Sequence, residues 1–288
     1  MIDVSVIIVN YNTCKITCEC IDSIVEKTKD VEYEIILVDN ASTDGSKEFF
    51  EKDSRIKYIY SECNGGFGYG NNLGMKVAKG KYFLLLNSDT LLINNAIKEF
   101  FDFAEKDEKK RVYGSYLLYE DGKTYCTSYF FFPTFTVFSF LKRVWSSSQI
   151  EIRDLKIKDV EAISGANMFF HQEIYKKTGG FDDKIFMYGE EGEWQYRMLK
   201  AGYPCRIINQ PKIIHLEAKS IKKIDSRITT KIAGHFYILR KHMFYPTYML
   251  ARIYYAINLT LKNIKNLFNP DYRDFWKTLY KPVRFKRT

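Results

Sequence analysis

Several patterns that would assign this chain to a common class are missing. The 288 residues include six cysteines but no C-x-x-C pair, which argues against a zinc or redox motif and favours reduced thiols in a cytosol. No apolar run reaches the ~20 residues that a membrane-spanning helix needs. A strand pattern begins directly after Met1, Ile2 and Asp3, so we expect no signal peptide.

Two nucleotide-binding fingerprints are also missing. The pattern G-x-x-x-x-G-K-[ST] does not occur, which excludes the P-loop enzymes. Gly66 and Gly68 have the spacing that opens G-x-G-x-x-G, but the third position is Asn71. This glycine-rich loop also follows the third predicted strand instead of the first, so a Rossmann dehydrogenase is disfavoured.

Positive charge is concentrated near the end of the chain. The formal net charge is +9, and residues 219–288 contain 16 Lys or Arg against three Asp or Glu. We therefore divide the chain into a predicted domain over 1–218 and a basic extension over 219–288. An excess of this kind suits an anionic surface, and no nucleic-acid-binding motif accompanies it, so a membrane surface is favoured over nucleic acid. A solvated helix pair packed on the first domain, or a homodimer contact, is the alternative.

Strand and helix patterns alternate in residues 1–90. Apolar strand patterns occupy 4–10, 34–38, 56–60 and 82–86, and helix patterns occupy 16–28, 47–52 and a segment that ends at Lys79. This alternation predicts an α/β fold with a mostly parallel sheet. Polar loops follow the first, second and fourth strands, and we expect them at one edge of the sheet, where ligands bind in open α/β sheets.

The pattern changes after residue 110, which divides the predicted domain into 1–110 and 111–218. A β-hairpin is predicted over 111–119 and 124–132, followed by an aromatic segment over 133–145. A strand is predicted over 160–170, and two more over 204–209 and 212–215. Helices are predicted over 190–201, 224–244 and 247–267, with a break at Pro246.

The apolar strand at 82–86 stops at Asn87, Ser88 and Asp89. Asp89 would lie at the carboxyl end of a central strand, where it could hold a divalent cation against a phosphate. The alternative is that these three residues cap a following helix.

Three acidic residues, Glu190, Glu191 and Glu193, begin a predicted helix. Acidic residues favour the first turn of a helix, which alone could account for them. They follow an apolar and aromatic run, however, and a carboxylate emerging there could take a proton from a substrate hydroxyl. His215 ends a predicted strand and could be a metal ligand or a structural histidine.

Six motifs, in this order, resemble those of the inverting family 2 glycosyltransferases of the GT-A fold, above all the bacterial rhamnosyltransferase-like branch. The resemblance covers about residues 3–220 and includes His215. The motifs lie at 4–12, 38–46, 64–74, 87–89, 164–166 and 180–191.

The resemblance implies roles for the residues within these motifs and nearby. Glu191 matches the general base, with Glu190 as the alternative, and Asp89 and His215 would bind Mg²⁺ or Mn²⁺. The residues implied in donor nucleotide binding are Asn10, Tyr11, Asn12, Asp39, Asn40, Asn64, Gly66, Asn71, Asn87 and Ser88. Those implied on the acceptor side are Gly165, Ala166 and Trp194.

Two departures from the family pattern matter. The family's D-x-D reads Asn87-Ser88-Asp89, so Asp89 is the one carboxylate in this motif. The family's Glu-Asp reads Glu190-Glu191, which replaces the usual aspartate by a longer side chain.

The resemblance implies transfer of rhamnose or another hexose from a dTDP- or UDP-linked donor to a glycan acceptor, expected to be lipid-linked, in bacterial polysaccharide or cell-surface glycan assembly. The expected location is cytoplasmic, peripheral on the inner face of the membrane. A non-catalytic nucleotide-sugar-binding protein that has lost its base is one alternative. A nucleotidyltransferase is another, although it would carry a basic glycine-rich loop where this chain has Tyr11, Asn12 and Thr13.

Overall fold

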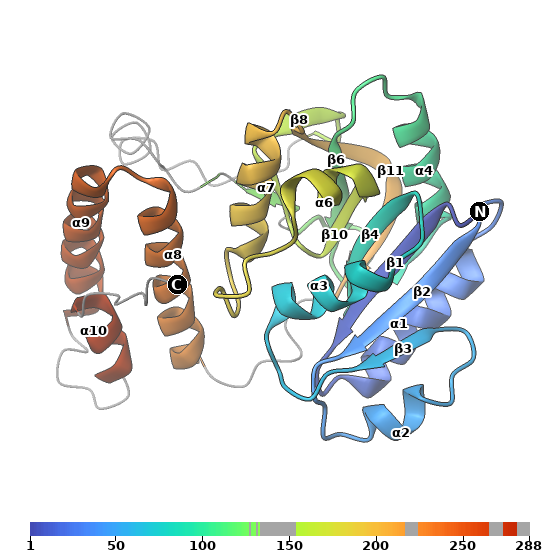
Figure 1. The fold of residues 1–288 in the computed structure, drawn as a ribbon, viewed down its shortest axis with the longest axis horizontal. Helices are drawn as coiled ribbons and strands as arrows, with labels where there is room; N and C mark the ends of the chain where they lie inside the picture. The colour runs from blue at the N-terminus through green and yellow to red at the C-terminus, as the bar shows by residue number, and fades with distance from the viewer. Residues whose placement is uncertain (127, 131, 133–153, 217–223, 265–272, 281–288) are drawn as a thin grey trace. The chain divides into compact units, whose positions relative to one another are not determined.

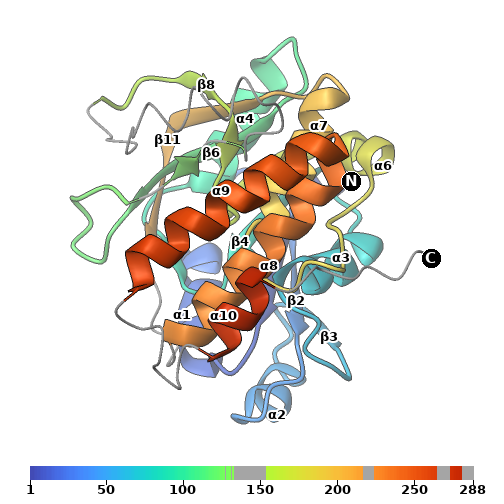
Figure 2. The same ribbon diagram turned by 90° about the vertical axis from the view of Figure 1, so that its left-hand side faces the viewer.

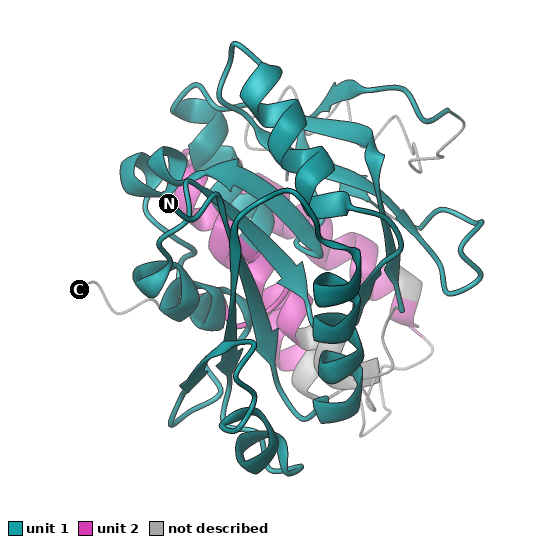
Figure 3. Ribbon diagram, turned by 90° about the vertical axis from the view of Figure 1, so that its right-hand side faces the viewer, with its two compact units in different colours: residues 1–132, 150–184, 191–220 teal, residues 133–149, 185–190, 221–288 magenta. Residues whose placement is uncertain are grey.

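The computed structural model describes residues 1–126, 128–130, 132, 154–216, 224–264 and 273–280 (Figure 1). The described residues divide into two units, which Figure 3 colours separately. Unit 1 contains those of 1–132, 150–184 and 191–220, and unit 2 contains those of 185–190 and 221–288. The short segment 185–190, which ends at the first residue of the predicted acidic helix, thus groups with the C-terminal helices.

A mixed sheet forms the centre of unit 1, with strand order β3-β2-β1-β4-β10-β6-β11-β5 and with β8 beside β11. The first four strands are parallel because a helix crosses over between each strand and the next. These strands are β1 (Val4–Asn10), β2 (Tyr33–Asp39), β3 (Lys57–Tyr60) and β4 (Tyr82–Asn87). The connecting helices are α1 (Cys14–Lys27), α2 (Ser46–Phe50) and α3 (Phe67–Val77).

The other half of the sheet is joined through an antiparallel strand. β10 (Asn167–His171) pairs with β4 on one side and with β6 on the other. The remaining strands of this sheet are β6 (Val112–Leu118), β11 (Cys205–His215), β5 (Thr90–Leu92) and β8 (Lys158–Val160). β6 and β11 are parallel, whereas β5 and β8 lie antiparallel to β11.

Helices cover both faces of the sheet. On one face Val6 and Ile8 of β1 pack with α1 and α4 (Ala96–Lys106). On the other, Ile7 packs with α3, α6 (Gln172–Thr178) and α7 (Glu190–Lys200). Burial on both faces explains why the central strands are almost continuously apolar.

Several local predictions are wrong. Among its described residues the predicted hairpin closes at the bridge between Leu118 and Tyr125, and β7 (Tyr129–Phe130) pairs instead with β9 (Ala162–Ile163). The predicted strand over 160–170 is three short strands, β8, β9 and β10, while the two predicted over 204–215 form the single strand β11. The helices α4, α6 and α10 (Arg273–Tyr280) and the strand β5 were not predicted. The aromatic segment 133–145 lies outside the described residues.

The C-terminal region of unit 2 is helical, as predicted. It contains α8 (Ile224–His242), α9 (Tyr245–Asn263) and α10 (Arg273–Tyr280), which pack together in Figure 2. Pro246 lies in the first turn of α9, where its missing N–H is tolerated, so α8 and α9 are separate helices. The core that they share contains Ile232, Phe236, Leu239, Met243, Tyr248, Ala251 and Leu279. Among the described residues, no helix has the length and apolar character needed to cross a membrane.

Candidate active site

The carboxyl ends of β1, β2 and β4 lie side by side. The strand register pairs Asn10 with Asp39, and Val9 with Asn87. The polar residues that follow these three strands therefore meet at one edge of the sheet, as predicted. This is the edge at which open α/β sheets bind their ligands.

Asn10 joins the loops that follow β1 and β2. Its Nδ2 donates to Ser42 Oγ at 3.0 Å, and its Oδ1 accepts from the hydroxyls of Thr13 and Thr17 at 2.9 Å each. The side chain is buried, so its observed role is to hold these loops in place.

The adjacent residues Tyr11 and Asn12 lie nearer the surface. Asn12 has a φ of 54°, a left-handed conformation that asparagine tolerates better than most residues. Its N–H donates to Ser42 Oγ at 2.9 Å, and its Oδ1 accepts from Thr43 N at 2.7 Å. The Tyr11 side chain is 47% exposed and is available to cover a planar group at this edge.

Asp39 and Asn40 end β2 inside the structure. Asp39 accepts from Ser42 N at 2.8 Å and from Tyr58 Oη at 3.0 Å. Burial, and then the charge of Asp39, raise the pKa of Tyr58 well above its usual range. Asn40 Nδ2 donates to Gly66 O at 2.9 Å, and its buried Oδ1 has no hydrogen-bond partner among the described residues. An unsatisfied buried acceptor costs about 1–3 kcal/mol, which a ligand donor would recover.

The glycine-rich segment lets α3 approach β1 closely. Gly66 has a φ of 90° and stands at the start of α3. A Cβ on Gly70 would lie 2.7 Å from Val9 Cγ1, and one on Gly74 would lie 2.5 Å from Ile7 Cγ2. Larger residues at these positions would push the helix away from the sheet.

Two asparagines hold the loop that leads into α3. Asn64 Oδ1 accepts from Gly66 N at 3.0 Å, and Asn71 Nδ2 donates to Phe67 O at 3.0 Å. Asn71 is buried, so its amide satisfies a helix-start carbonyl and does not point to solvent. Asn64 and Asn71 thus shape the loop, and their contact with a donor stays a prediction.

Asp89 and His215 come together although they are far apart in the sequence. His215 Nε2 lies 3.3 Å from Asp89 Oδ1 and 3.4 Å from Asn87 Nδ2. The pairing of β11 with β5 creates this approach, because its register sets His215 opposite Thr90. Residues 87–89 form the turn into β5, and the alternative that they cap a following helix is wrong. Ser88 Oγ lies 3.4 Å from Thr13 Oγ1 in the loop after β1.

The electrostatics of this pair suit a cation. Burial opposes protonation of His215, but the hydrogen bonds and charges of Asp89 and Cys126 outweigh it and raise the pKa of the imidazole to about 10. An ion bound here would displace the imidazole proton, and a carboxylate oxygen and a neutral imidazole nitrogen are suitable ligands for Mn²⁺ or Mg²⁺, so these residues fit such an ion. In the described ranges no third His, Cys, Asp or Glu completes a metal cluster.

The three glutamates at the start of α7 have different surroundings. Glu193 is 0% exposed and Glu190 is 3% exposed, whereas Glu191 is only partly buried. A Cβ on Gly165 would lie 3.7 Å from Glu191 Cβ and 3.2 Å from the ring of Phe67. Gly165 thus brings Glu191 beside the first residue of α3.

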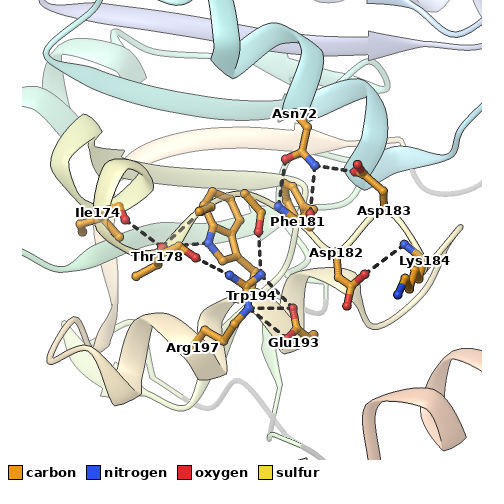
Figure 4. Close-up of polar contacts among 12 residues, drawn as sticks. Asn72, Ile174, Thr178, Phe181, Asp182, Asp183, Lys184, Glu193, Trp194 and Arg197 are labelled. Atoms are coloured by element: carbon orange, nitrogen blue, oxygen red, sulfur yellow. Dashed lines mark hydrogen bonds and ion pairs between the residues drawn. The ribbon is translucent and has the colours of Figure 1, made fainter. Parts of the chain in front are cut away.

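The two other predicted acceptor-side residues lie in different places. The carbonyl of Ala166 accepts from Asn87 N at 3.1 Å, so this segment adjoins the end of β4. Trp194 is fully buried and packs on Phe181 with ring centroids 4.6 Å apart. Its Nε1 donates to Thr178 Oγ1 at 3.0 Å (Figure 4). Trp194 is therefore a core residue in this structure and offers no surface to an acceptor.

Sequence analysis missed an ion pair that anchors α7. The Arg197 guanidinium binds the carboxylate of Glu193 at 2.9–3.1 Å. It also donates to the carbonyl of Thr178 and, at 2.6 Å, to that of Gly180 (Figure 4). The spacing of Glu193 and Arg197, four residues apart in a predicted helix, was the available signal.

Asn72 is a second residue that sequence analysis missed. Its Oδ1 accepts from Phe181 N at 2.9 Å, and its Nδ2 donates to Phe181 O at 2.9 Å and to Asp183 Oδ1 at 2.6 Å (Figure 4). These bonds connect α3, which follows the glycine-rich loop, to the segment that leads toward α7. The polar edge of the sheet and the acidic helix are therefore positioned together.

The comparisons with known proteins identify a family and a fold. The family model described as glycosyl transferase family 2 matches residues 5–179. A GT-A structure, that of S. aureus TarS, superposes with a TM-score of 0.54 over 82% of this chain and 44% of TarS, at 15% identity, and so supports the fold.

Two curated relatives each match a part of the chain that is shorter than half its length. Glycosyltransferase GlyG of Streptococcus pneumoniae is 35% identical over 128 residues, which cover 42% of this chain and 42% of GlyG. The poly(ribitol-phosphate) beta-glucosyltransferase of Bacillus spizizenii is 34% identical over 111 residues, or 36% of this chain and 18% of that enzyme. The matched part thus spans less than half the length of either relative.

Proposed function

This chain belongs to glycosyl transferase family 2, and from that premise we propose that it is an inverting glycosyltransferase acting on a nucleoside diphosphate sugar. One observation carries the proposal. At the end of β4, Asn87 N donates to Ala166 O, Asp89 follows Asn87 in the same turn and pairs with His215, and Gly165, next to Ala166, lies beside Glu191. A cation-binding pair and a partly exposed carboxylate are the two parts that the reaction needs.

The donor in this proposal lies across the ends of β1, β2 and β4. The loops held by Asn10 and Asp39, the exposed Tyr11 and the unsatisfied Oδ1 of Asn40 support a nucleotide site there. We assign the donor to the dTDP- or UDP-linked hexoses, with rhamnose as one candidate sugar. Asp89 and His215 would hold Mg²⁺ or Mn²⁺, which supplies charge neutralisation for the departing diphosphate.

Glu191 is the proposed general base. It removes the proton of an acceptor hydroxyl, whose oxygen forms a bond to the anomeric carbon as the bond from that carbon to the diphosphate oxygen breaks. A single displacement of this kind inverts the anomeric configuration. Glu190, which is almost completely buried, is the alternative base.

The proposed acceptor is a glycan, carried on a lipid at the cytoplasmic face of the membrane. Support comes from the basic C-terminal region, where residues 219–288 contain 16 Lys or Arg against three acidic residues. Anionic headgroups attract such segments by about 1 kcal/mol for each Lys or Arg near the surface. A homodimer contact through this region is the alternative.

Changing Glu191 to Gln tests the assignment, with Glu190→Gln as the matched control. We expect Glu191→Gln to lower sugar transfer by about 10²–10⁴-fold, the usual contribution of base catalysis, and to leave binding of the nucleotide sugar with Mn²⁺ unchanged in a thermal-shift assay. Loss of transfer in Glu190→Gln alone would move the base to Glu190.

Two further measurements separate the alternative functions. A non-catalytic binder would release no nucleoside diphosphate from any donor, with or without acceptor. A nucleotidyltransferase would release pyrophosphate from a nucleoside triphosphate. Full transfer in the presence of EDTA would remove the divalent cation from the proposal.

A further inference from the structure

Helix α9 is apolar on two opposite faces. One face packs in the helical core through Tyr248 and Ala251. The opposite face carries five aliphatic side chains, each between 52% and 66% exposed. They are Leu250, Ile253, Ile257, Leu261 and Ile264. We call these five residues the exposed stripe.

The exposed stripe is continuous along the helix. At 100° per residue the five side chains fall within an arc of about 80°, and the 14 residue steps from Leu250 to Ile264, the C-cap of α9, cover about 21 Å. A row of exposed aliphatic side chains of this length marks an interaction surface.

The chain around the exposed stripe is uniformly basic. No acidic residue occurs between Asp225 and Asp271, whereas that interval contains seven Lys or Arg. Two of them, Arg240 and Arg252, lie against aromatic rings of α8 and α9, with the Arg240 guanidinium 4.8 Å from the ring centre of Tyr245. The segment between Asp225 and Asp271 is therefore basic in sequence and has an apolar line along one face of α9.

We propose that the exposed stripe docks on an anionic lipid bilayer, with α9 lying in the plane of the membrane surface. The five aliphatic side chains enter the boundary between headgroups and acyl chains, and the basic residues of α8 and α9 bind the headgroup phosphates. This inference deepens the proposed membrane location of the enzyme and rests on it. It names the residues that make the contact.

Charge distinguishes the bilayer from a second copy of the chain. A symmetric dimer through α9 would bring together two segments that each carry seven positive side chains and no acidic one. Like charges facing each other disfavour that contact, whereas anionic headgroups neutralise the same charges. The bilayer therefore satisfies both the apolar stripe and the basic surroundings.

The test is flotation of the full chain with vesicles of phosphatidylcholine containing phosphatidylglycerol. We expect the wild-type chain to float with these vesicles and to bind pure phosphatidylcholine much more weakly. The variant Ile253→Asp/Ile257→Asp should bind the anionic vesicles at least tenfold more weakly. Ile157→Asp, which changes a 40% exposed isoleucine in unit 1, is the matched control and should float like the wild type.

Three outcomes decide the matter. Undiminished flotation of the double variant, with its fold verified by circular dichroism, would overturn the proposal. Equal binding to vesicles with and without phosphatidylglycerol would also overturn it. A wild-type dimer that the double variant converts to a monomer, with neither form floating, would assign the stripe to a homodimer instead. Glu191→Gln should float normally, so loss of transfer with intact flotation separates failure of the base assignment from failure of the docking surface.

Discussion

Replacing Arg197 by methionine should strongly destabilise unit 1. The Arg197 guanidinium contacts the carboxylate of Glu193 at 2.9–3.1 Å and also donates to the carbonyls of Thr178 and Gly180. The side chain of Glu193 is 0% exposed, and that of Arg197 is 25% exposed. Methionine would fill part of the space but would leave a buried carboxylate without this counter-charge.

The burial of this ion pair sets the expected losses of stability. Removing one partner of a buried ion pair costs roughly 3–5 kcal/mol, because the other charge stays buried. Glu193→Gln removes the carboxylate charge and leaves Arg197 its two carbonyl acceptors, so we expect a smaller loss of about 2 kcal/mol. In the double variant no unpaired carboxylate remains. Adding Glu193→Gln to Arg197→Met should therefore restore part of the lost stability.

Urea unfolding of the four proteins in this double-mutant cycle measures the effect. The chain has three tryptophans, and Trp194 lies in the unit being tested. Phenylalanine at Trp145 and Trp276 would make Trp194 fluorescence the specific reporter. The reasoning is refuted if Glu193→Gln further destabilises Arg197→Met by its full single-variant cost, since the carboxylate would then not be the source of the penalty.

Three other predictions concern separate parts of the chain. A Cβ on Gly234 would lie 2.9 Å from Tyr188 O, so Gly234→Ala should lower the urea midpoint of unit 2 by overpacking that costs about 1–3 kcal/mol. Burial lowers the pKa of His235 to about 4 from an ordinary 6.5. The neutral imidazole therefore contributes its full stability to unit 2 above pH 6.5, and the unfolding free energy falls by at most about 3 kcal/mol between pH 6.5 and 4. His235→Phe should remove this pH dependence from the unfolding free energy. Asn72→Asp places a carboxylate against Asp183 and removes the donor to the buried carbonyl of Phe181. Thermal unfolding should therefore show a loss of stability of about 1–3 kcal/mol. Asp183→Ser alone should not cause this loss.

The part of the site that depends on local pattern was predictable. Each of the strands β1, β2 and β4 is an apolar run that stops at a polar residue, at Asn10, Asp39 and Asn87. Parallel strands joined by helices place such ends at one edge, so the meeting of these residues followed from the order of elements along the chain. The approach of His215 to Asp89 was implied only by the family resemblance.

Pairing between distant strands was not predictable from local pattern. The turn of the predicted hairpin does form, since Asp121 accepts from Lys123 N and Thr124 N at 2.8 Å each. Every residue of β6 is nevertheless buried, and a strand buried throughout needs neighbours along both edges. β10 and β11 provide them from more distant parts of the chain, so β7 is left to pair with β9. Likewise β5 forms because it pairs with the free edge of β11. Its three residues have no strong strand pattern of their own.

The position of Glu190, Glu191 and Glu193 in the first turn of a helix does not tell which of them is the base. The geometry of the helix favours Glu191 as the proposed base. At 100° per residue, Glu190, Glu193 and Arg197 fall within about 60° of one another, whereas Glu191 is turned about 100° from Glu190. Glu190 and Glu193 are buried on their side, and the ion pair with Arg197 fixes that side of α7 against the segment 178–180. The same rotation directs Glu191 toward Gly165. The Cβ of Glu191 lies 3.7 Å from the point that a Cβ on Gly165 would occupy. The ion pair therefore sets the rotation of α7, and with it the direction of the carboxylate assigned to the acceptor.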